Sequence, residues 1–374
     1  MDWKVRYINY PLHFKKIERE VMDTIYTVLF KGDLVLRQQL KDFENNFASF
    51  VGTKYAIGVS NCTDALHLSL RSLGIGRGDE VITVSHTFVA TVEAIKNVGA
   101  EPVLIDIGDD HNMDVNLVEA AITSKTKSII PVHLNGRICN MDKLIAIADK
   151  YNLVIVEDSA QALGGSFKGI KGGAFGKTGG FSFYPAKLLG AFGDGGAVAT
   201  NDKELADKIK LLRDHGRSKN NEIEFWGFNC RLDNLQAAIL DLKLKKLPGW
   251  ISRRREVASL YHKGLSEIEG LLLPPPPQED GPFFDVFQNY EIEGEKRNEL
   301  RSYLAEKGVE TMITWGGKAI HQFKSLALNH FSLPRTEKLF EGILMLPMHP
   351  DLSDDDVNYI IETIKEFYKI KKAK

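Results

Sequence analysis

Cysteine is scarce in this sequence, and the three cysteines are far apart. Cys62, Cys139 and Cys230 form no Cys-x-x-Cys pair, which excludes the common zinc-binding and dithiol motifs. We expect reduced thiols buried in the core of a cytoplasmic protein.

The sequence also lacks a long apolar run and an excess of charge. No apolar stretch approaches the roughly 20 residues of a membrane-spanning helix, and the beginning of the chain shows no signal-peptide pattern. With 48 basic and 50 acidic residues, the formal net charge is −2. A net charge this close to zero does not predict a basic surface that would bind nucleic acid or a membrane. We therefore expect a soluble cytoplasmic protein that has neither as a partner.

Several functional motifs are absent. The ten histidines show no His-Glu-x-x-His or other close metal spacing, so no metal site is predicted. No Gly-x-Ser-x-Gly sequence is present, which argues against a serine hydrolase. Residues 172–178 nearly match a phosphate-binding P-loop, but Lys171 occupies the position of its first glycine. A P-loop-like nucleotide-binding protein stays open as a remote alternative.

The pattern of apolar residues indicates a large α/β domain. The chain has 374 residues, 43% of them hydrophobic, enough for one large and one smaller domain. Short apolar runs alternate with amphipathic segments, which predicts a mostly parallel sheet covered by helices. The predicted strands are residues 80–84, 102–106, 128–134, 153–158, 180–184 and 196–200. The predicted helices are residues 63–73, 88–98, 141–151 and 202–213.

The last third of the sequence predicts a smaller α+β domain. A helical stretch over 232–261 precedes four prolines at 274–277, a stiff extended connection. Beyond it we expect a strand over 285–293, a helix over 296–307 and a terminal helix over 353–368. We assign residues 1–250 to the large domain and residues 251–374 to the small one.

A lysine and an acid stand out within the large domain. Asp158 ends an apolar predicted strand, and Lys187 follows in Phe181-Ser-Phe-Tyr-Pro-Ala-Lys187. Such a lysine can form a Schiff base while the carboxylate keeps a pyridine nitrogen protonated, as pyridoxal phosphate (PLP) chemistry requires. The spacing alone also allows a helix cap and a surface lysine.

Ordered motifs favour the cofactor. They are Ser60-Asn-Cys-Thr-Asp64, Val84-Ser-His-Thr-Phe88, Val156-Glu-Asp-Ser-Ala-Gln161, Gly179 to Lys187, Arg213-Asp-His-Gly216 and Asn229-Cys-Arg-Leu-Asp233. Together they resemble the DegT/DnrJ/EryC1/StrS sugar aminotransferases, PLP enzymes of fold type I. The resemblance implies a mostly parallel, seven-stranded sheet in the large domain.

The resemblance also implies a role for each matched position. Lys187 would bind the cofactor as a Schiff base and move the proton between cofactor and substrate, and Asp158 would pair with the pyridine nitrogen. Gln161 would contact the phenolic oxygen, and Phe88 would stack on the ring. The phosphate would be bound by Thr63, the backbone amide of Asp64, Ser182 and, from a neighbouring subunit, Asn229. The substrate would be contacted by Arg37, His86, Arg231, Trp315 and His321.

Four departures from the family pattern leave the substrate open. Cys62 stands where glycine is usual, and Arg37 replaces the second glycine of its motif. Residues 314–317, Thr-Trp-Gly-Gly, stand in place of His-Tyr-Pro. Residues 287–290, Phe-Gln-Asn-Tyr, stand in place of a common Tyr-His pair. In relatives, the regions of the last three contact the sugar nucleotide.

We expect a PLP-dependent homodimer that moves an amino group from glutamate to a nucleotide-linked 3-keto-6-deoxyhexose in amino-sugar biosynthesis. The alternatives are a 4-keto nucleotide sugar, a keto-cyclitol or a small phosphorylated ketone. Related dehydratases carry histidine at the position of Lys187 or bind an iron–sulfur cluster through cysteines, so transamination is favoured. Loss of Lys187 or Asp158 would favour a non-enzymatic sensor with this fold, but both residues are present.

Overall fold

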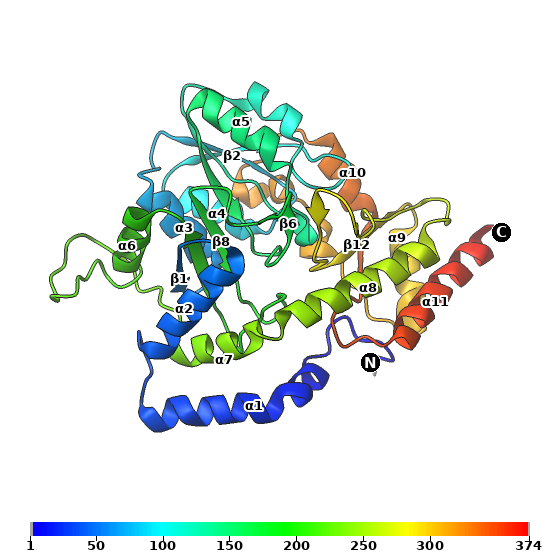
Figure 1. Cartoon of the computed structure of the whole chain (residues 1–374). Helices are drawn as coiled ribbons and strands as arrows, with labels where there is room; N and C mark the ends of the chain where they lie inside the picture. The colour runs from blue at the N-terminus through cyan, green and yellow to red at the C-terminus, as the bar shows by residue number, and fades with distance from the viewer. Residues whose placement is uncertain (1–2, 373–374) are drawn as a thin grey trace.

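The computed structural model describes residues 3–372 and is organised around a seven-stranded sheet (Figure 1). The strand order is β1-β9-β8-β5-β4-β2-β3. Only β9 runs antiparallel to its neighbours among the pairings of this sheet, so the mostly parallel sheet is confirmed. Its strands are β1 (Tyr55–Val59), β2 (Glu80–Val84), β3 (Glu101–Ile105), β4 (Thr126–Ile129), β5 (Val154–Asp158), β8 (Thr178–Ser182) and β9 (Gly196–Thr200).

Helices cover both faces of this sheet because its strands are apolar on both sides. In β5, Val156 contacts the cluster formed by α3 (Cys62–Ser72) and α4 (Val89–Asn97), whereas Ile155 contacts α5 (Met141–Tyr151). Successive side chains of a strand point to opposite faces. On the α5 side, the aromatic side chains of α2 (Gln38–Val51) pack on Phe181 and Phe183 of the lysine segment.

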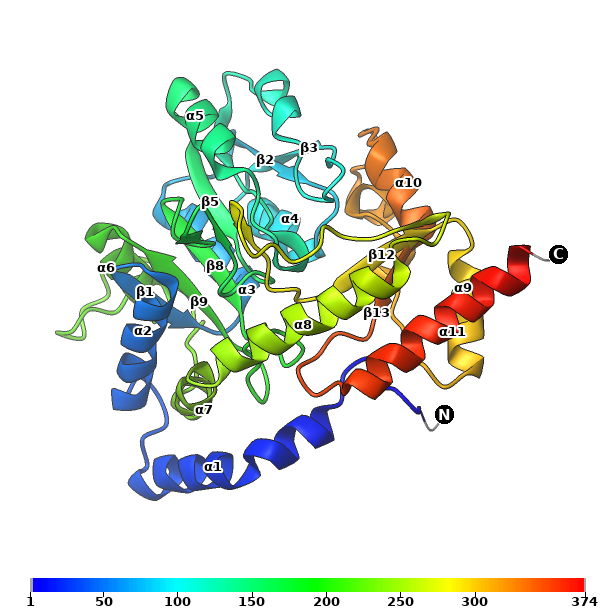
Figure 2. The same ribbon diagram turned by 45° about the vertical axis from the view of Figure 1, so that its right-hand side comes forward.

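A smaller region follows the main sheet. Its sheet has the order β10-β12-β13, and it packs on α8, α9 and α11. Its elements are α8 (Leu247–Leu265), β10 (Leu271–Leu272), β12 (Tyr290–Gly294), α9 (Arg297–Glu306), α10 (Pro334–Gly342), β13 (Ile343–Leu346) and α11 (Asp354–Lys372). Figure 2 shows α8 running unbroken from the main sheet to α11. The predicted division at residue 250 falls inside this helix and stays a prediction.

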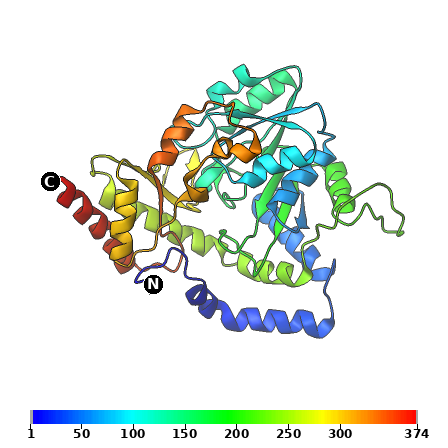
Figure 3. The same cartoon turned by 180° about the vertical axis from the view of Figure 1, so that it is seen from behind.

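The remaining elements lie at the periphery. A third sheet, β11-β6-β7, joins the two regions through β6 (Ser166–Phe167), β7 (Ile170–Lys171) and β11 (Phe283–Phe284). The long helix α1 (Tyr10–Lys31) lies along one edge of the molecule against α7 (Asn234–Leu244), as Figures 1 and 3 show. The helix predicted over 202–213 is α6 (Lys203–Leu212), which packs beside α3.

Most predicted elements of the main sheet are confirmed to within a few residues, but two predictions beyond it are wrong. The single helix predicted over 232–261 is two helices, α7 and α8, with Pro248 in the first turn of the second. Only residues 290–294 of the strand predicted over 285–293 belong to a strand, β12. Within residues 3–372, no helix has the length and apolarity to cross a membrane. The three cysteines are buried free thiols.

Candidate active site

Three parallel strands end at one edge of the main sheet. β5 ends at Asp158 and β8 at Ser182, while β1 leads into α3. The start of β9 approaches the start of α3 closely, because a Cβ at Gly196 would lie 2.4 Å from the carbonyl carbon of Asn61. A side chain at Gly196 would therefore displace α3. This edge, where open α/β sheets bind ligands, combines an acid, a hydroxyl and a helix N-terminus.

Asp158 is buried and its carboxylate is held at both oxygens. Thr91 donates a hydrogen bond of 2.7 Å to Oδ2, and the backbone N–H of Ala160 donates one of 3.1 Å to Oδ1. Thr91 lies on α4, three residues after Phe88. A carboxylate oxygen has two lone pairs, so Asp158 can accept a further proton donor, such as a protonated ring nitrogen.

Lys187 is half-buried, and its amine has no hydrogen-bond partner among residues 3–372. Burial lowers the pKa of this amine, although the Asp158 carboxylate and the Cys62 thiol partly oppose the shift. A lowered pKa makes the neutral, nucleophilic form of a lysine more accessible. The unpaired amine near a buried carboxylate fits a PLP site.

Gln288 holds the backbone on both sides of Lys187. Its Oε1 accepts a 2.7 Å hydrogen bond from the N–H of Leu188, and its Nε2 donates one of 2.8 Å to the carbonyl of Ala186. Gln288 is 6% exposed and precedes β12 of the smaller region. The sequence singled out Gln288 only as a departure from the family pattern, because its partners are backbone groups.

Replacing Gln288 with leucine should destabilise the protein. The change leaves a buried N–H at Leu188 and a buried carbonyl at Ala186 without partners, which costs about 1–3 kcal/mol. Denaturant unfolding of the cofactor-free protein measures this loss. Gln38→Leu is the control, because Gln38 is exposed and contacts only Asp42 through its side chain. Equal stability of the two variants would contradict the role of Gln288.

The expected phosphate end of the site is partly preorganised. Thr63 lies in the first turn of α3, and its hydroxyl has no partner among the described residues. Ser182 accepts a 3.3 Å hydrogen bond from the N–H of Tyr184, so its own hydroxyl proton stays available. The backbone amide of Asp64 donates to Oδ1 of Asn61 at 2.8 Å. An anion would have to compete with this cap for the Asp64 amide.

The aromatic candidates lie together on the other side of the site. Phe88 is 55% exposed, and its ring lies 6.5 Å from that of Trp315. Trp315 also contacts His86, whose side chain has no exposure to solvent. Phe88 thus has a free ring face, whereas His86 does not reach the surface.

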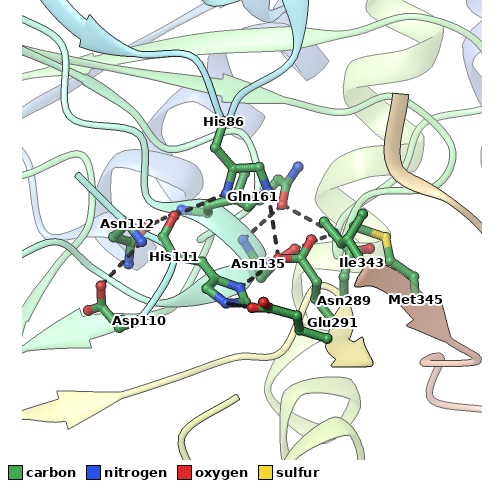
Figure 4. Close-up of polar contacts among 12 residues, drawn as sticks. His86, Asp110, His111, Asn112, Asn135, Gln161, Asn289, Glu291, Ile343 and Met345 are labelled. Carbon is green, nitrogen blue, oxygen red and sulfur yellow. Dashed lines mark hydrogen bonds and ion pairs between the residues drawn. The ribbon is translucent and has the colours of Figure 1, made fainter. Parts of the chain in front are cut away.

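His86 belongs to a buried charged cluster. Its Nδ1 lies 3.1 Å from the carbonyl of His111, and its Nε2 lies 3.6 Å from Glu291 (Figure 4). Burial alone would lower the pKa of His111, but hydrogen bonds to Glu291 and Glu293 raise it to about 9. Glu291 is therefore paired with a protonated His111. His86 therefore packs against a buried ion pair, which gives its side chain a structural role.

The remaining predicted residues are His321, Arg37 and Arg231 for the substrate and Asn229 for the cofactor phosphate. His321 is 3% exposed and lies 2.7 Å from the hydroxyl of Ser85. Arg37 and Asn229 are exposed, and their side chains have no partner among the described residues. Arg231 forms a 2.9 Å ion pair with Asp214. No hydrogen bond or ion pair among residues 3–372 joins any two of these four side chains.

Comparison with known proteins identifies the family of this chain. The model of the DegT/DnrJ/EryC1/StrS aminotransferase family matches residues 15–365. A dTDP-3-amino-3,4,6-trideoxy-alpha-D-glucose transaminase of Streptomyces venezuelae is 39% identical over 368 residues, which cover 97% of this chain and 96% of that protein. A pleiotropic regulatory protein of Geobacillus stearothermophilus is 40% identical over 359 residues, 95% of this chain and 96% of the relative.

Solved structures agree with this result. S. venezuelae DesV in complex with a ketimine intermediate superposes with a TM-score of 0.94 at 38% identity and covers 98% of both chains. NtdA from Bacillus subtilis with bound cofactor PMP has a TM-score of 0.88 at 29% identity, covering 97% of this chain and 83% of the other. The fold is therefore that of these solved aminotransferases.

Proposed function

The chain belongs to the DegT/DnrJ/EryC1/StrS aminotransferase family, and from this premise we propose that its amino acceptor is a nucleotide-linked 3-keto-6-deoxyhexose and its donor is glutamate. The protein is a PLP-dependent aminotransferase of fold type I, as the sequence predicted. The product would serve amino-sugar biosynthesis, for a surface polysaccharide or a natural product. We place this activity in the cytoplasm.

The observation that supports the aminotransfer chemistry at this edge is the unpaired, half-buried amine of Lys187 within electrostatic reach of Asp158. When bound, PLP supplies an electron sink that stabilises negative charge on the substrate carbon. Lys187 would hold the cofactor and afterwards move a proton at the reacting carbon. Asp158, oriented by the hydroxyl of Thr91, would keep the proton on the ring nitrogen.

Groups around this pair would bind and orient the ligands. The hydroxyls of Thr63 and Ser182 would bind the phosphate, as hydroxyl donors beside a helix N-terminus do in anion sites. Phe88 would cover one face of the ring and exclude water. Arg37 is exposed and unpaired, which supports a role in binding an anionic group of the substrate.

The position of the ketone is supported by the relatives. The S. venezuelae relative is named for a 3-amino sugar, and transaminases from Micromonospora megalomicea and Aneurinibacillus thermoaerophilus, 39% and 40% identical, are named likewise. A 4-keto nucleotide sugar, a keto-cyclitol and a small phosphorylated ketone stay as alternatives. Incubating the protein and glutamate with a panel of 3-keto and 4-keto nucleotide sugars, read by mass spectrometry, tests the proposal. Amination of the 4-keto sugars alone would refute it.

We further propose that two chains form each active site. The side of α1 away from α7 exposes apolar side chains, and the rings of Tyr26 and Phe30 stack at 5.7 Å while 67% and 79% exposed. Trp226, three residues before Asn229, is 91% exposed. Exposed apolar side chains of this kind, on α1 and separately on the loop that carries Trp226, mark interaction sites. A second chain that buries the loop of Trp226 would also contact Asn229.

Mixing two inactive variants tests the shared site. Asn229→Asp would place a carboxylate against the phosphate of the partner's cofactor, and Lys187→Ala removes the amine. After complete subunit exchange, half of the dimers are mixed and each has one intact site, so activity should recover to about a quarter of wild type. No recovery despite exchange shown by mass spectrometry would place Asn229 in its own chain's site.

A further inference from the structure

The orientation of the Gln161 side-chain amide is fixed by its partners. Its Oε1 accepts a 2.9 Å hydrogen bond from the backbone N–H of Asn135 and a 3.2 Å hydrogen bond from Nδ2 of Asn289. A backbone N–H can only donate, so the atom that faces it must be the oxygen. Figure 4 shows Gln161, Asn135 and Asn289 directed at one another.

This orientation leaves the nitrogen of Gln161 free. Nε2 has no hydrogen-bond partner among residues 3–372, and the side chain is only half-buried. Gln161 lies three residues after Asp158, at the same edge of the sheet. Its two N–H groups are therefore available to an acceptor that binds at this edge.

Asn289 is itself held at both ends of its amide. Nδ2 also donates a 2.8 Å hydrogen bond to Oδ1 of Asn135, and Oδ1 accepts one of 3.2 Å from the hydroxyl of Tyr7. The backbone is fixed as well, because the N–H of Gln288 donates to the carbonyl of Asn135 at 2.9 Å. A side chain with this many partners has one orientation, and it can impose an orientation on Gln161.

We propose that Asn289 is a positioning residue that turns the amide of Gln161 so that its N–H donates to the phenolic oxygen of bound PLP. The inference rests on the proposed role of Gln161. Asn289 reaches the site from the smaller region, where the sequence departs from the family pattern. It would act on the cofactor only through Gln161.

The consequence is measurable without turnover. An N–H donor stabilises negative charge on the phenolic oxygen, which lowers the pKa of the neighbouring Schiff-base nitrogen. In the cofactor-loaded protein, the pH midpoint of the visible absorption change reports this pKa. Gln161→Met should raise the midpoint by about one pH unit, because one hydrogen bond to a charged group is lost. Asn289→Leu should raise it by less, because the backbone N–H of Asn135 still donates to Oε1 of Gln161.

A double variant and a matched control distinguish the proposal from a general destabilisation of the site. If Asn289 acts through Gln161, adding Asn289→Leu to Gln161→Met should shift the midpoint no further. Tyr7→Phe removes a hydrogen bond of Asn289 but leaves both donations from Nδ2, so its midpoint should stay near wild type. Asn289→Ser serves if the leucine variant does not fold, as judged by thermal unfolding of the cofactor-free protein.

The results distinguish failure of the proposed function from failure of the inference about Asn289. A wild-type protein that gives no visible band with PLP would refute the proposed function. A band whose midpoint is moved by Gln161→Met but not by Asn289→Leu or Asn289→Ser would overturn the inference alone. Additive shifts in the double variant, an equal shift in Tyr7→Phe, or no shift in Gln161→Met would overturn it too.

Discussion

Replacing Lys187 with alanine should abolish the visible absorption band of the PLP-loaded protein and lower transamination by on the order of a thousandfold or more. The band requires a covalent bond between an amine and the cofactor, and the amine of Lys187 is half-buried and unpaired. The same amine would move the proton at the reacting carbon, so both functions are lost together. Absorption spectra and single-turnover assays with glutamate measure the two effects.

Lys243 offers a matched control. Burial lowers the pKa of Lys243 to about 8, as burial lowers that of Lys187, but the Lys243 amine donates to the carbonyl of Gly190. Lys243→Met should therefore keep the band. A band that survives Lys187→Ala and disappears in Lys243→Met would assign the cofactor to the other lysine. ATP binding by a protein that takes up no PLP would instead revive the P-loop alternative.

Asp158→Asn should retain PLP but lower turnover by on the order of a hundredfold or more. An amide cannot hold the proton of the ring nitrogen, so the cofactor is a weaker electron sink in both half-reactions. Stopped-flow absorption with glutamate, and separately with a keto-sugar, measures each half. Thr91→Val should cause a smaller loss, because it removes only the hydrogen bond that orients Asp158.

Asp106 provides the control for this change. It is also buried at the end of a strand, β3, and its carboxylate accepts hydrogen bonds from the backbone N–H groups of Arg335 and Thr336. Asp106→Asn should lower stability without lowering turnover per folded molecule. Near-wild-type rates in Asp158→Asn would mean that another residue pairs with the ring nitrogen.

The main sheet could be predicted because its strands are short apolar runs between clear turns. The predicted boundaries of β9 and α5, residues 196–200 and 141–151, match those of the structure. Residues 285–288, Asp-Val-Phe-Gln, begin the segment predicted as a strand, yet they lie alongside Asn135 and Gly136 instead of joining one. That contact depends on how the smaller region docks, which periodicity within one segment does not encode.

The site residues also differ in whether the sequence alone could predict them. Lys187 and Asp158 could be proposed from the sequence because the chemistry expected of them requires a lysine and a carboxylate side chain. The contacts of Gln288 and Asn289 are with backbone groups, other amides and the hydroxyl of Tyr7, so their residue types carry no chemical signature in the sequence. The burial of His86 depends on Trp315 and Phe340 from the smaller region. A single motif could not reveal that packing.

The strand order affects how this protein folds while it is being synthesised on the ribosome. β1 is the first strand of the main sheet to be synthesised, and it pairs only with β9, the last. Until β9 leaves the ribosome, the apolar strand β1 and the aromatic face of α2 have no sheet to join. Long-range pairings of this kind slow folding and expose sticky edges to other chains. The nascent chain should therefore depend on chaperones at least up to the synthesis of β9.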